Sequence, residues 1–140
     1  TQWACLLDIN GFKVINDTYG HAKGDAALIQ IARFLEQVVP KHTIVSRYGG
    51  DEFALLTSAL TEREVLQILA RLEQKLTEFN ASGRIADAIT VSVGCAPLLM
   101  EDHENLDAFL QQLDLGMYTA KQESKKLDTD GRSVVFHFCK

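Results

Sequence analysis

Two short apolar segments near the middle of the chain flank the run Gly49-Gly50-Asp51-Glu52, and this arrangement restricts the fold more than any other feature. The segments cover residues 44–48 and 53–57. Paired glycines accept the positive φ angles of a tight hairpin turn, so we expect the two segments to pair as antiparallel strands. The fold must then contain an antiparallel hairpin whose turn carries two carboxylates.

The remaining segments alternate between strand-like and helix-like patterns. Residues 3–9 are almost continuously apolar up to Asp8, which is typical of a buried strand. Further strands are expected at 89–96 and 134–138, and helices at 12–19, 24–39, 61–80 and 105–123, the third opened by the capping box Thr61-Glu62-Arg63-Glu64. This order predicts an α/β (α+β) fold with a central, mostly antiparallel mixed sheet of about five strands flanked by helices.

Length and charge limit the class of protein. The chain has 140 residues, which suits one domain. Its 14 Lys and Arg and 19 Asp and Glu give a net charge of −5, which argues against a general nucleic-acid-binding protein. No apolar segment is long enough to span a membrane and no signal-peptide pattern is present, so we expect a cytoplasmic domain without membrane contact. Accordingly, Cys5, Cys95 and Cys139 are expected to be reduced thiols.

Carboxylates stand where two of the predicted strands end. Asp8 ends the first strand, and Asp51 lies in the hairpin turn. If the hairpin pairs with the first strand, these two carboxylates face each other, and hard oxygen ligands are what Mg²⁺ prefers. Acidic residues are also common at strand ends and turns for solvation alone, so this pattern by itself leaves both interpretations open.

Gly11-Phe12-Lys13 joins the first strand to a helix and is a candidate phosphate-binding segment. Free N–H groups at a helix N terminus can hold phosphate oxygens, and a lysine can add charge. The spacing is not that of a P-loop, and an ordinary connection with an exposed lysine is the alternative.

Asn16, His21 and Asp25 follow within a few helical turns. An amide and a carboxylate together match the donors and acceptors on the edge of guanine. Taken singly, each residue is equally explained by a turn, a helix end or a helix start.

Several of these residues belong to longer motifs that occur in a fixed order. The motifs are Asp8-Ile9-Asn10-Gly11-Phe12-Lys13-Val14-Ile15-Asn16-Asp17-Thr18-Tyr19-Gly20-His21, Gly24-Asp25, Arg47-Tyr48-Gly49-Gly50-Asp51-Glu52-Phe53, Thr90-Val91-Ser92-Val93-Gly94 and, with Asp114, Tyr118-Thr119-Ala120-Lys121. Together they closely resemble the GGDEF family of diguanylate cyclases over about residues 7–121.

The resemblance implies a fold similar to the palm of polymerases and adenylyl cyclases, with the Gly-Gly-Asp-Glu-Phe hairpin at the active site. It implies an enzyme that condenses two GTP molecules into cyclic di-GMP, a bacterial second messenger, with release of two pyrophosphates. The active site is then shared between two antiparallel protomers of a transient or regulated homodimer, with Mg²⁺, or Mn²⁺, as cofactor. The alternative is an inactive GTP-binding regulatory domain attached to a cyclic di-GMP phosphodiesterase or a sensor.

The resemblance also implies roles for single residues. The metal ligands are Asp8, the carbonyl of Ile9, Asp51 and Glu52, and the catalytic residues are Asp51 as the base, Glu52 and Lys13. The nucleotide-binding residues are Asn16, His21 and Asp25 for guanine, and Gly11, Phe12, Lys13 and Lys121 for phosphate. A second phosphate-binding cation on the tail is either Lys125 or Arg132.

The chain departs from the family pattern in five places, and at one of them Gly11 replaces a bulkier residue that is common there. Asn10 replaces a second aspartate, which we expect to be tolerated because the first is the usual ligand. The Arg-x-x-Asp product-inhibition motif would fall at Pro40 and Thr43, so no feedback inhibition through that site is expected. Residues 122–130 intervene before the expected Gly-Arg pair, Gly131-Arg132. Finally, the helix and turn that usually precede the first strand are missing, so we expect residues 1–140 to be one domain excised from a longer protein, whose attachment to a membrane the sequence leaves open.

Overall fold

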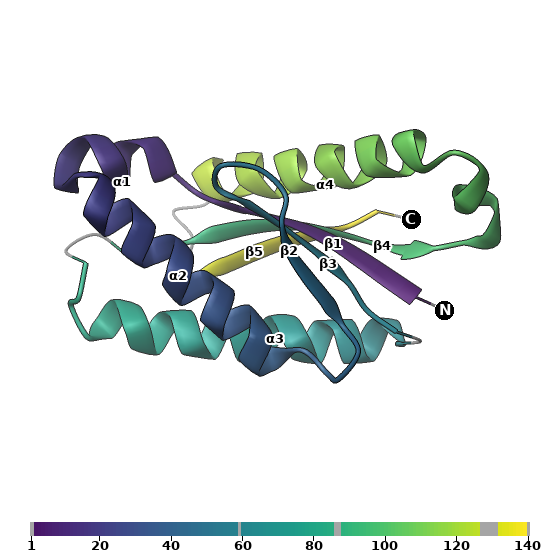
Figure 1. Cartoon of the computed structure of the whole chain (residues 1–140), viewed down its shortest axis with the longest axis horizontal. Helices are drawn as coiled ribbons and strands as arrows, with labels where there is room; N and C mark the ends of the chain where they lie inside the picture. Colours follow the sequence, from purple (N-terminus) through teal and green to yellow (C-terminus); the bar gives the residue numbers. More distant parts are fainter. Residues whose placement is uncertain (1, 59, 86–87, 127–131, 140) are drawn as a thin grey trace.

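The computed structural model describes residues 2–58, 60–85, 88–126 and 132–139, which form one five-stranded sheet with helices on both faces (Figure 1). In chain order the elements are β1 (Gln2–Ile9), α1 (Phe12–Tyr19), α2 (His21–Val38), β2 (Ile44–Arg47), β3 (Glu52–Leu56), α3 (Glu62–Ala81), β4 (Val91–Leu98), the short 3₁₀ helix η1 (Met100–Glu104), α4 (Leu106–Lys126) and β5 (Val134–Phe138). Every strand and helix predicted from the sequence is present in the predicted order, and η1 is the addition.

The strands lie in the order β2-β3-β1-β4-β5. The pairs β2–β3, β3–β1 and β1–β4 are antiparallel, and β4–β5 is parallel. The prediction of a mostly antiparallel mixed sheet is therefore confirmed. The first strand lies at the centre of the sheet, with the hairpin on one side of it, so the end of β1 and the turn between β2 and β3 are neighbours.

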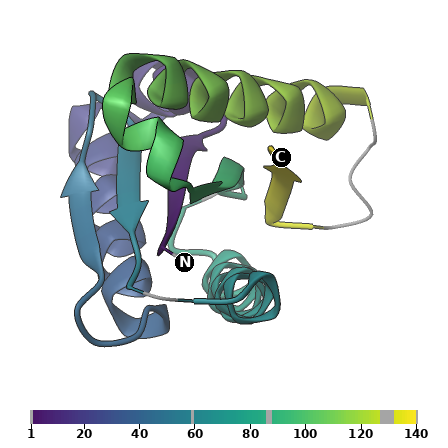
Figure 2. The same cartoon turned by 90° about the vertical axis from the view of Figure 1, so that its right-hand side faces the viewer.

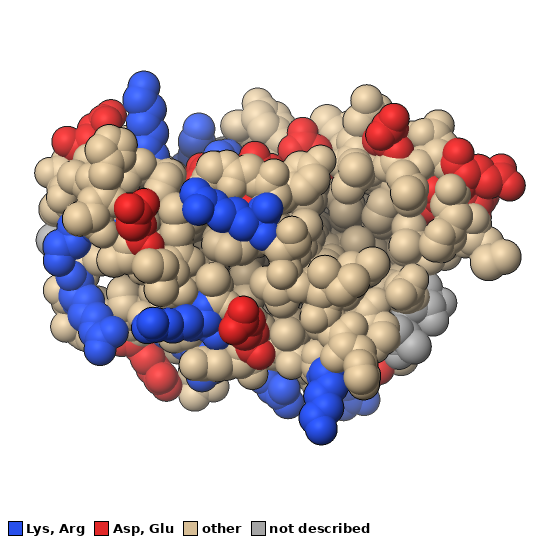
Figure 3. Space-filling view, in the orientation of Figure 1, with Lys and Arg blue, Asp and Glu red and all other residues tan. Residues whose placement is uncertain are grey.

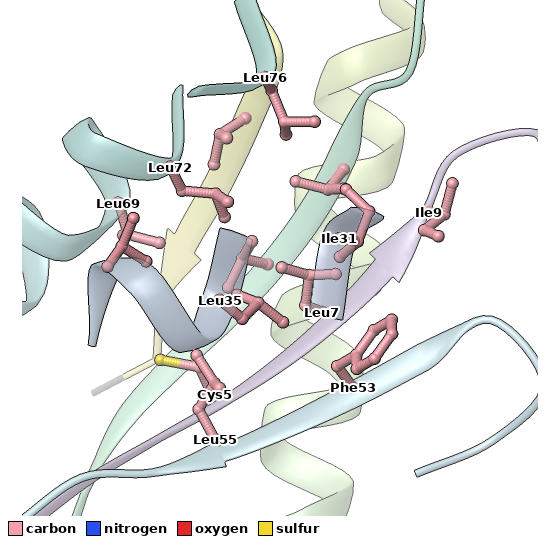
Figure 4. Close-up of a cluster of buried hydrophobic side chains, with 14 of the residues drawn as sticks. Cys5, Leu7, Ile9, Ile31, Leu35, Phe53, Leu55, Leu69, Leu72 and Leu76 are labelled. Atoms are coloured by element: carbon pink, nitrogen blue, oxygen red, sulfur yellow. The ribbon is translucent and has the colours of Figure 1, made fainter. Parts of the chain in front are cut away.

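The helices form two layers around the sheet (Figure 2). Helix α4 packs on one face through Phe109 and Leu113, which contact Ala4 and Leu6 of β1. Helices α2 and α3 cover the opposite face, and their side chains surround the odd-numbered side chains of β1 (Figure 4). That larger cluster includes Cys5, Leu7, Ile9, Ile31, Leu35, Phe53, Leu55, Leu69, Leu72 and Leu76. Because side chains alternate along a strand, Asp8 shares the α4 face with Ala4 and Leu6.

Helix α4 approaches β4 closely at two glycines. A β-carbon at Gly94 would lie 2.5 Å from the carbonyl oxygen of Leu113 and 2.5 Å from the backbone nitrogen of Met117. A β-carbon at Gly116 would overlap with Sγ of Cys139 and lie 3.5 Å from Cα of Gly94. The backbones of α4 and β4 are therefore in direct contact here. This contact sets the distance between α4 and the sheet five residues before Lys121.

Local signals explain where the elements begin. The capping box before α3 is confirmed, since Thr61 Oγ1 accepts from the backbone N–H of Glu64 at 3.2 Å and Glu64 Oε1 accepts from that of Thr61 at 3.0 Å. Helix α2 begins at His21 rather than at residue 24, because Gly20, at φ 89°, both ends α1 and precedes the first residue of α2.

Among the described residues, no helix combines the length and apolar character needed to cross a lipid bilayer.

The surface charge is mixed. On the face shown in Figure 3, Lys and Arg side chains are interspersed with acidic ones and form no continuous basic surface over the described residues. Acidic side chains gather at the end of the molecule formed by η1 and the start of α4, where Glu101, Asp102 and Asp107 lie.

Candidate active site at the end of strand β1

The last residues of β1 lie against the hairpin turn. Asp8 is the direct cross-strand partner of Glu52 on one side and of Ser92 on the other. The backbone N–H of Ile9 donates to the carbonyl oxygen of Asp51 at 3.2 Å. Strand register therefore brings together the first acid and the hairpin acids, which are more than forty positions apart in the sequence.

Asp8 is a buried carboxylate with only one of its oxygens engaged. The residue is 6% exposed, and Lys121 Nζ of α4 lies 2.5 Å from its Oδ2. Its Oδ1 is buried and has no hydrogen-bond partner among the described residues. Burial raises the pKa of Asp8 to about 6, the hydrogen bond from Lys121 opposes that rise, and the nearby Asp51 carboxylate adds to it.

Glu52 belongs to the same electrostatic environment. Burial raises the pKa of Glu52, the carboxylates of Asp51 and Asp114 raise it further, and Lys121 lowers it. The carboxylates of Asp8 and Glu52 thus share the nearby ammonium group of Lys121, and the Asp51 carboxylate is close to both. An additional cation at this place would relieve the repulsion between them.

The donor set fits a hard divalent cation only in part. The described residues hold no group of three or more His, Cys, Asp and Glu side chains arranged for a metal ion. The unengaged, buried Oδ1 of Asp8 is nevertheless a suitable oxygen ligand, and the Asp51 carboxylate is close to it. Since Mg²⁺ commonly keeps water and phosphate oxygens among its six ligands, two carboxylates and a backbone carbonyl would suffice in the presence of a phosphorylated ligand.

Arg47 holds the hairpin turn in shape, a role that the sequence analysis did not assign. Its Nη2 donates to the carbonyl oxygen of Gly50 at 2.6 Å and its Nε to that of Gly49 at 3.3 Å.

Neither Gly49 nor Gly50 has a positive φ angle, so the prediction that the turn needs these glycines for positive φ angles was wrong. The turn spans four residues between β2 and β3 and is closed by Tyr48 N–H, which donates to Glu52 O at 2.8 Å.

The segment after Asp8 turns sharply into α1. Gly11 adopts the left-handed conformation, at φ 64° and ψ 26°, and precedes the first residue of the helix. Among the described residues no side chain caps this helix, so the N–H groups of its first turn, those of Phe12, Lys13 and Val14, have no partner inside the helix. The Lys13 side chain is exposed beside them. The segment can therefore present N–H groups and an ammonium group to an anion.

Asn10 is engaged within the chain. Its Nδ2 donates to Thr90 Oγ1 at 3.0 Å, and its Oδ1 accepts from Ser92 Oγ at 2.8 Å. Asn10 thus ties the end of β1 to the start of β4. Both polar atoms of its side chain have partners, which explains how an amide fits at this position.

The predicted guanine-binding residues lie at the corner between α1 and α2. The side chain of half-buried Asn16 occupies the space next to Gly24 of α2. His21 and Asp25 lie in the first turn or two of α2 and are exposed. The α1–α2 corner therefore holds all three residues.

The two candidates for a second tail cation lie in different places. Arg132 lines a hollow with Leu66 and Glu73 of α3, whereas Lys121 belongs to α4 and its side chain reaches Asp8. Arg132 is therefore on the other face of the sheet and is not brought to Asp8. Lys125 is exposed one helical turn beyond Lys121 on α4, and residues 127–131 of the tail lie outside the described part of the chain.

Comparisons with known proteins agree on one family. A family model described as "Diguanylate cyclase, GGDEF domain" matches residues 3–127. The diguanylate cyclase DgcM of Escherichia coli is 35% identical over 120 residues, which make up 86% of this chain and 28% of DgcM. The chain thus spans less than a third of that relative.

Solved structures agree as well. The GGDEF domain of YfiN, or TpbB, from Pseudomonas aeruginosa matches with a TM-score of 0.77 at 28% identity and covers 99% of this chain and 83% of that one. The active GGEEF domain of a diguanylate cyclase from Vibrio cholerae matches with a TM-score of 0.77 at 25% identity over 100% of this chain and 84% of that one.

Proposed function

This chain belongs to the diguanylate cyclase GGDEF domain family, and from that premise we propose that it is an active diguanylate cyclase domain. In the proposed reaction, two GTP molecules bound to two antiparallel copies form cyclic di-GMP. The 3′-oxygen of each GTP attacks the α-phosphorus of the other, a new phosphodiester bond forms, and the bond to the β-phosphate breaks with release of pyrophosphate. One observation carries the proposal: Asp8, Asp51, Glu52 and Lys121 gather at the end of β1.

The carboxylates would hold the metal ion. Asp8 and Asp51, with the carbonyl of Ile9 and support from Glu52, supply hard oxygen ligands for Mg²⁺ or Mn²⁺. When bound, the divalent cation neutralises charge on the transferring phosphoryl group. Asp51, which is half-buried in the turn, is the proposed acceptor of the proton from the 3′-hydroxyl.

Cations and N–H groups of the chain would hold the nucleotide. The first-turn N–H groups of α1 and the Lys13 ammonium group face the phosphates in this proposal, and Lys121 contributes from α4. Asn16 donates to and accepts from the guanine edge, Asp25 accepts from its N–H groups, and His21 lies in the same nucleotide site. Positioning and charge stabilisation of this kind account for most catalysis of phosphoryl transfer.

A second candidate function is a GTP-binding domain without turnover. The position of Arg132 on the α3 side supports it, because Arg132 then does not supply the tail cation of the family pattern, and of the two candidates Lys125 alone lies on α4. Such a domain would bind GTP and regulate an attached domain instead of catalysing the condensation.

Mass spectrometry of the nucleotide products tests the proposal. The protein is fused to a dimerising coiled coil, which raises the effective concentration of the second copy, and is incubated with GTP and Mg²⁺. We expect cyclic di-GMP and pyrophosphate in a ratio of one to two, and none from Asp51→Ala. GTP binding by calorimetry without product from a folded dimer would contradict catalysis and favour the regulatory function.

A further inference from the structure

Lys121 makes an ion pair with the carboxylate that is proposed to hold the metal. Its Nζ lies 2.5 Å from Asp8 Oδ2, and the two residues are 113 positions apart in the sequence. The Asp8 side chain is 9% exposed, whereas that of Lys121 is 32% exposed. The carboxylate is therefore fixed in the sheet, and the ammonium group reaches it from a side chain that still has access to solvent.

We propose that Lys121 acts as the resident counter-ion of Asp8 in the nucleotide-free domain, and that it exchanges Asp8 for the phosphates of GTP when a divalent cation binds. This inference rests on the proposed function and adds a mode of regulation to the same site. Lys121 would then make metal binding depend on the nucleotide.

Electrostatics favours the exchange. A divalent cation held by Asp8 would contact its carboxylate directly, so an ammonium group on the same carboxylate would be a few ångströms from that cation. Two like charges at that distance repel strongly in a partly buried site. A metal ion that binds without nucleotide therefore has to displace the Lys121 ammonium group while no other anion is present to pair with it.

GTP changes the outcome because it brings the receiving anion. Its phosphates carry several negative charges and lie between the metal site and the α1 N terminus in the proposed complex. The ammonium group of Lys121 then gains a partner at the moment it loses Asp8. In this proposal Lys121 weakens metal binding when the nucleotide is absent and does not weaken it when the nucleotide is bound. The difference between these two metal affinities is a coupling free energy between metal and nucleotide.

The structure is consistent with a Lys121 side chain that moves while the backbone of α4 stays in place. The backbone of α4 is held on β4 by the contact between Gly94 and the Leu113–Met117 turn, one helical turn before Lys121. Exchange then requires only that the four-carbon stem of Lys121 changes rotamer. The competing interpretation is a static ion pair, in which the metal uses the unengaged Oδ1 of Asp8 while Lys121 stays on Oδ2.

Binding of Mn²⁺ alone, followed by the electron paramagnetic resonance signal of free Mn²⁺, is the first measurement. We expect Lys121→Met to bind Mn²⁺ without nucleotide more tightly than the wild-type chain, by about 5- to 150-fold, the usual range of coupling between two sites. Lys121→Gln, which retains a hydrogen-bond donor for Asp8, provides a second neutral variant. Lys75→Met on α3, across the sheet, is the matched control and should leave Mn²⁺ affinity unchanged, and Asp8→Asn should abolish site-specific binding.

The same variants are titrated with a GTP analogue that has a non-cleavable α,β bridge, in the presence of a chelator. We expect Lys121→Met to bind the analogue more weakly while it binds Mn²⁺ more tightly. An ion pair that stays in place would also repel Mn²⁺, but it would do so with and without the bound analogue. Mn²⁺ is therefore also titrated at saturating analogue: a gain in Lys121→Met that disappears there identifies the exchange, and a gain that persists would overturn it. Thermal melting of each variant shows whether it is folded.

Unchanged or weaker Mn²⁺ binding by folded Lys121→Met and Lys121→Gln would overturn the exchange. That result is independent of turnover: a chain that makes cyclic di-GMP but shows no change keeps the proposed function and loses the exchange. Conversely, tighter Mn²⁺ binding that is confined to the nucleotide-free protein, in a chain without turnover, supports the exchange and argues for the regulatory function.

Discussion

Gly24 of α2 and Asn16 of α1 pack so closely that a β-carbon at position 24 would overlap with Oδ1 of Asn16. The same β-carbon would lie 3.3 Å from Cζ of Phe12. Asn16 is the proposed guanine-binding amide, and its side chain uses the space that Gly24 leaves empty. The glycine therefore has a positioning role in the proposed nucleotide site.

Gly24→Ala is expected to weaken GTP binding without weakening the fold. The side chain of Asn16 can rotate away, so the clash is relieved cheaply, and alanine improves helix propensity by up to about 1 kcal/mol. The displaced amide should lose its hydrogen bond to guanine, which lowers GTP affinity by roughly tenfold. Calorimetry with GTP and denaturant unfolding measure the two effects. Asn16→Ala should cause a similar loss, and the double variant should be no worse than either; additive losses would contradict the positioning role.

Asp8→Asn is expected to remove a pH dependence of stability in the metal-free protein. The pKa of Asp8 in the folded chain is about 6, above the ordinary value of 3.8, so between these values the folded state keeps a proton that the unfolded state has lost. Stability of the wild-type chain should therefore fall as the pH rises from about 4 to about 6. Chemical unfolding in the presence of a chelator at several pH values should show this slope, and it should be reduced in Asp8→Asn. An equal slope in both proteins would contradict the assignment to Asp8.

Gly94→Ala is expected to destabilise the domain more than Gly116→Ala. The new methyl group at position 94 would meet the backbone of α4, which cannot rotate away, and overpacking of this kind costs about 1–3 kcal/mol. At position 116 the main obstacle is the Cys139 side chain, which can change rotamer. Denaturant unfolding of both variants tests the order. Because a raised α4 moves Lys121 away from Asp8, Gly94→Ala should also lower GTP turnover.

Arg47→Ala is expected to lower turnover while leaving stability nearly unchanged. Arg47 is exposed, so its removal should change the unfolding free energy by about 0.5 kcal/mol at most. Without its bonds to the Gly49 and Gly50 carbonyls, the turn that carries Asp51 becomes less well positioned, which can reduce turnover by up to about a hundredfold. Steady-state formation of cyclic di-GMP measures this effect. Arg63→Ala, at an exposed position on α3, is the matched control, and equal turnover in the two variants would refute a role for Arg47.

The sequence predicted the elements well because most of them carry strong local signals. The bounds of α1 and β5 agree with the structure at both ends, and the Thr61 capping box placed the start of α3. Helix η1 was missed because five residues with no buried side chain leave no apolar pattern to detect. The mostly antiparallel character of the sheet was predictable from the hairpin of β2 and β3, which lies beside β1 because β3 also pairs with β1.

The contacts within the candidate site were less predictable. Nothing near Lys121 in the sequence indicates that it pairs with Asp8, because the pairing depends on how α4 crosses the sheet. The close packing of Gly24 on Asn16 is likewise a property of the α1–α2 corner and not of either residue. Arg47 was visible only as part of a motif, since its bonds to the turn carbonyls depend on the turn geometry.

The central place of β1 in the sheet has a consequence for how different parts of the site respond to thermal fluctuation. Asp8 pairs with β3 on one side and β4 on the other, so a local opening that releases its backbone has to break two ladders at once. Its amide should therefore exchange with deuterium only when the whole domain unfolds, while the turn after Arg47 exchanges through small excursions. The carboxylate can then serve as the fixed reference against which lysine, turn and nucleotide rearrange in the proposed catalytic cycle.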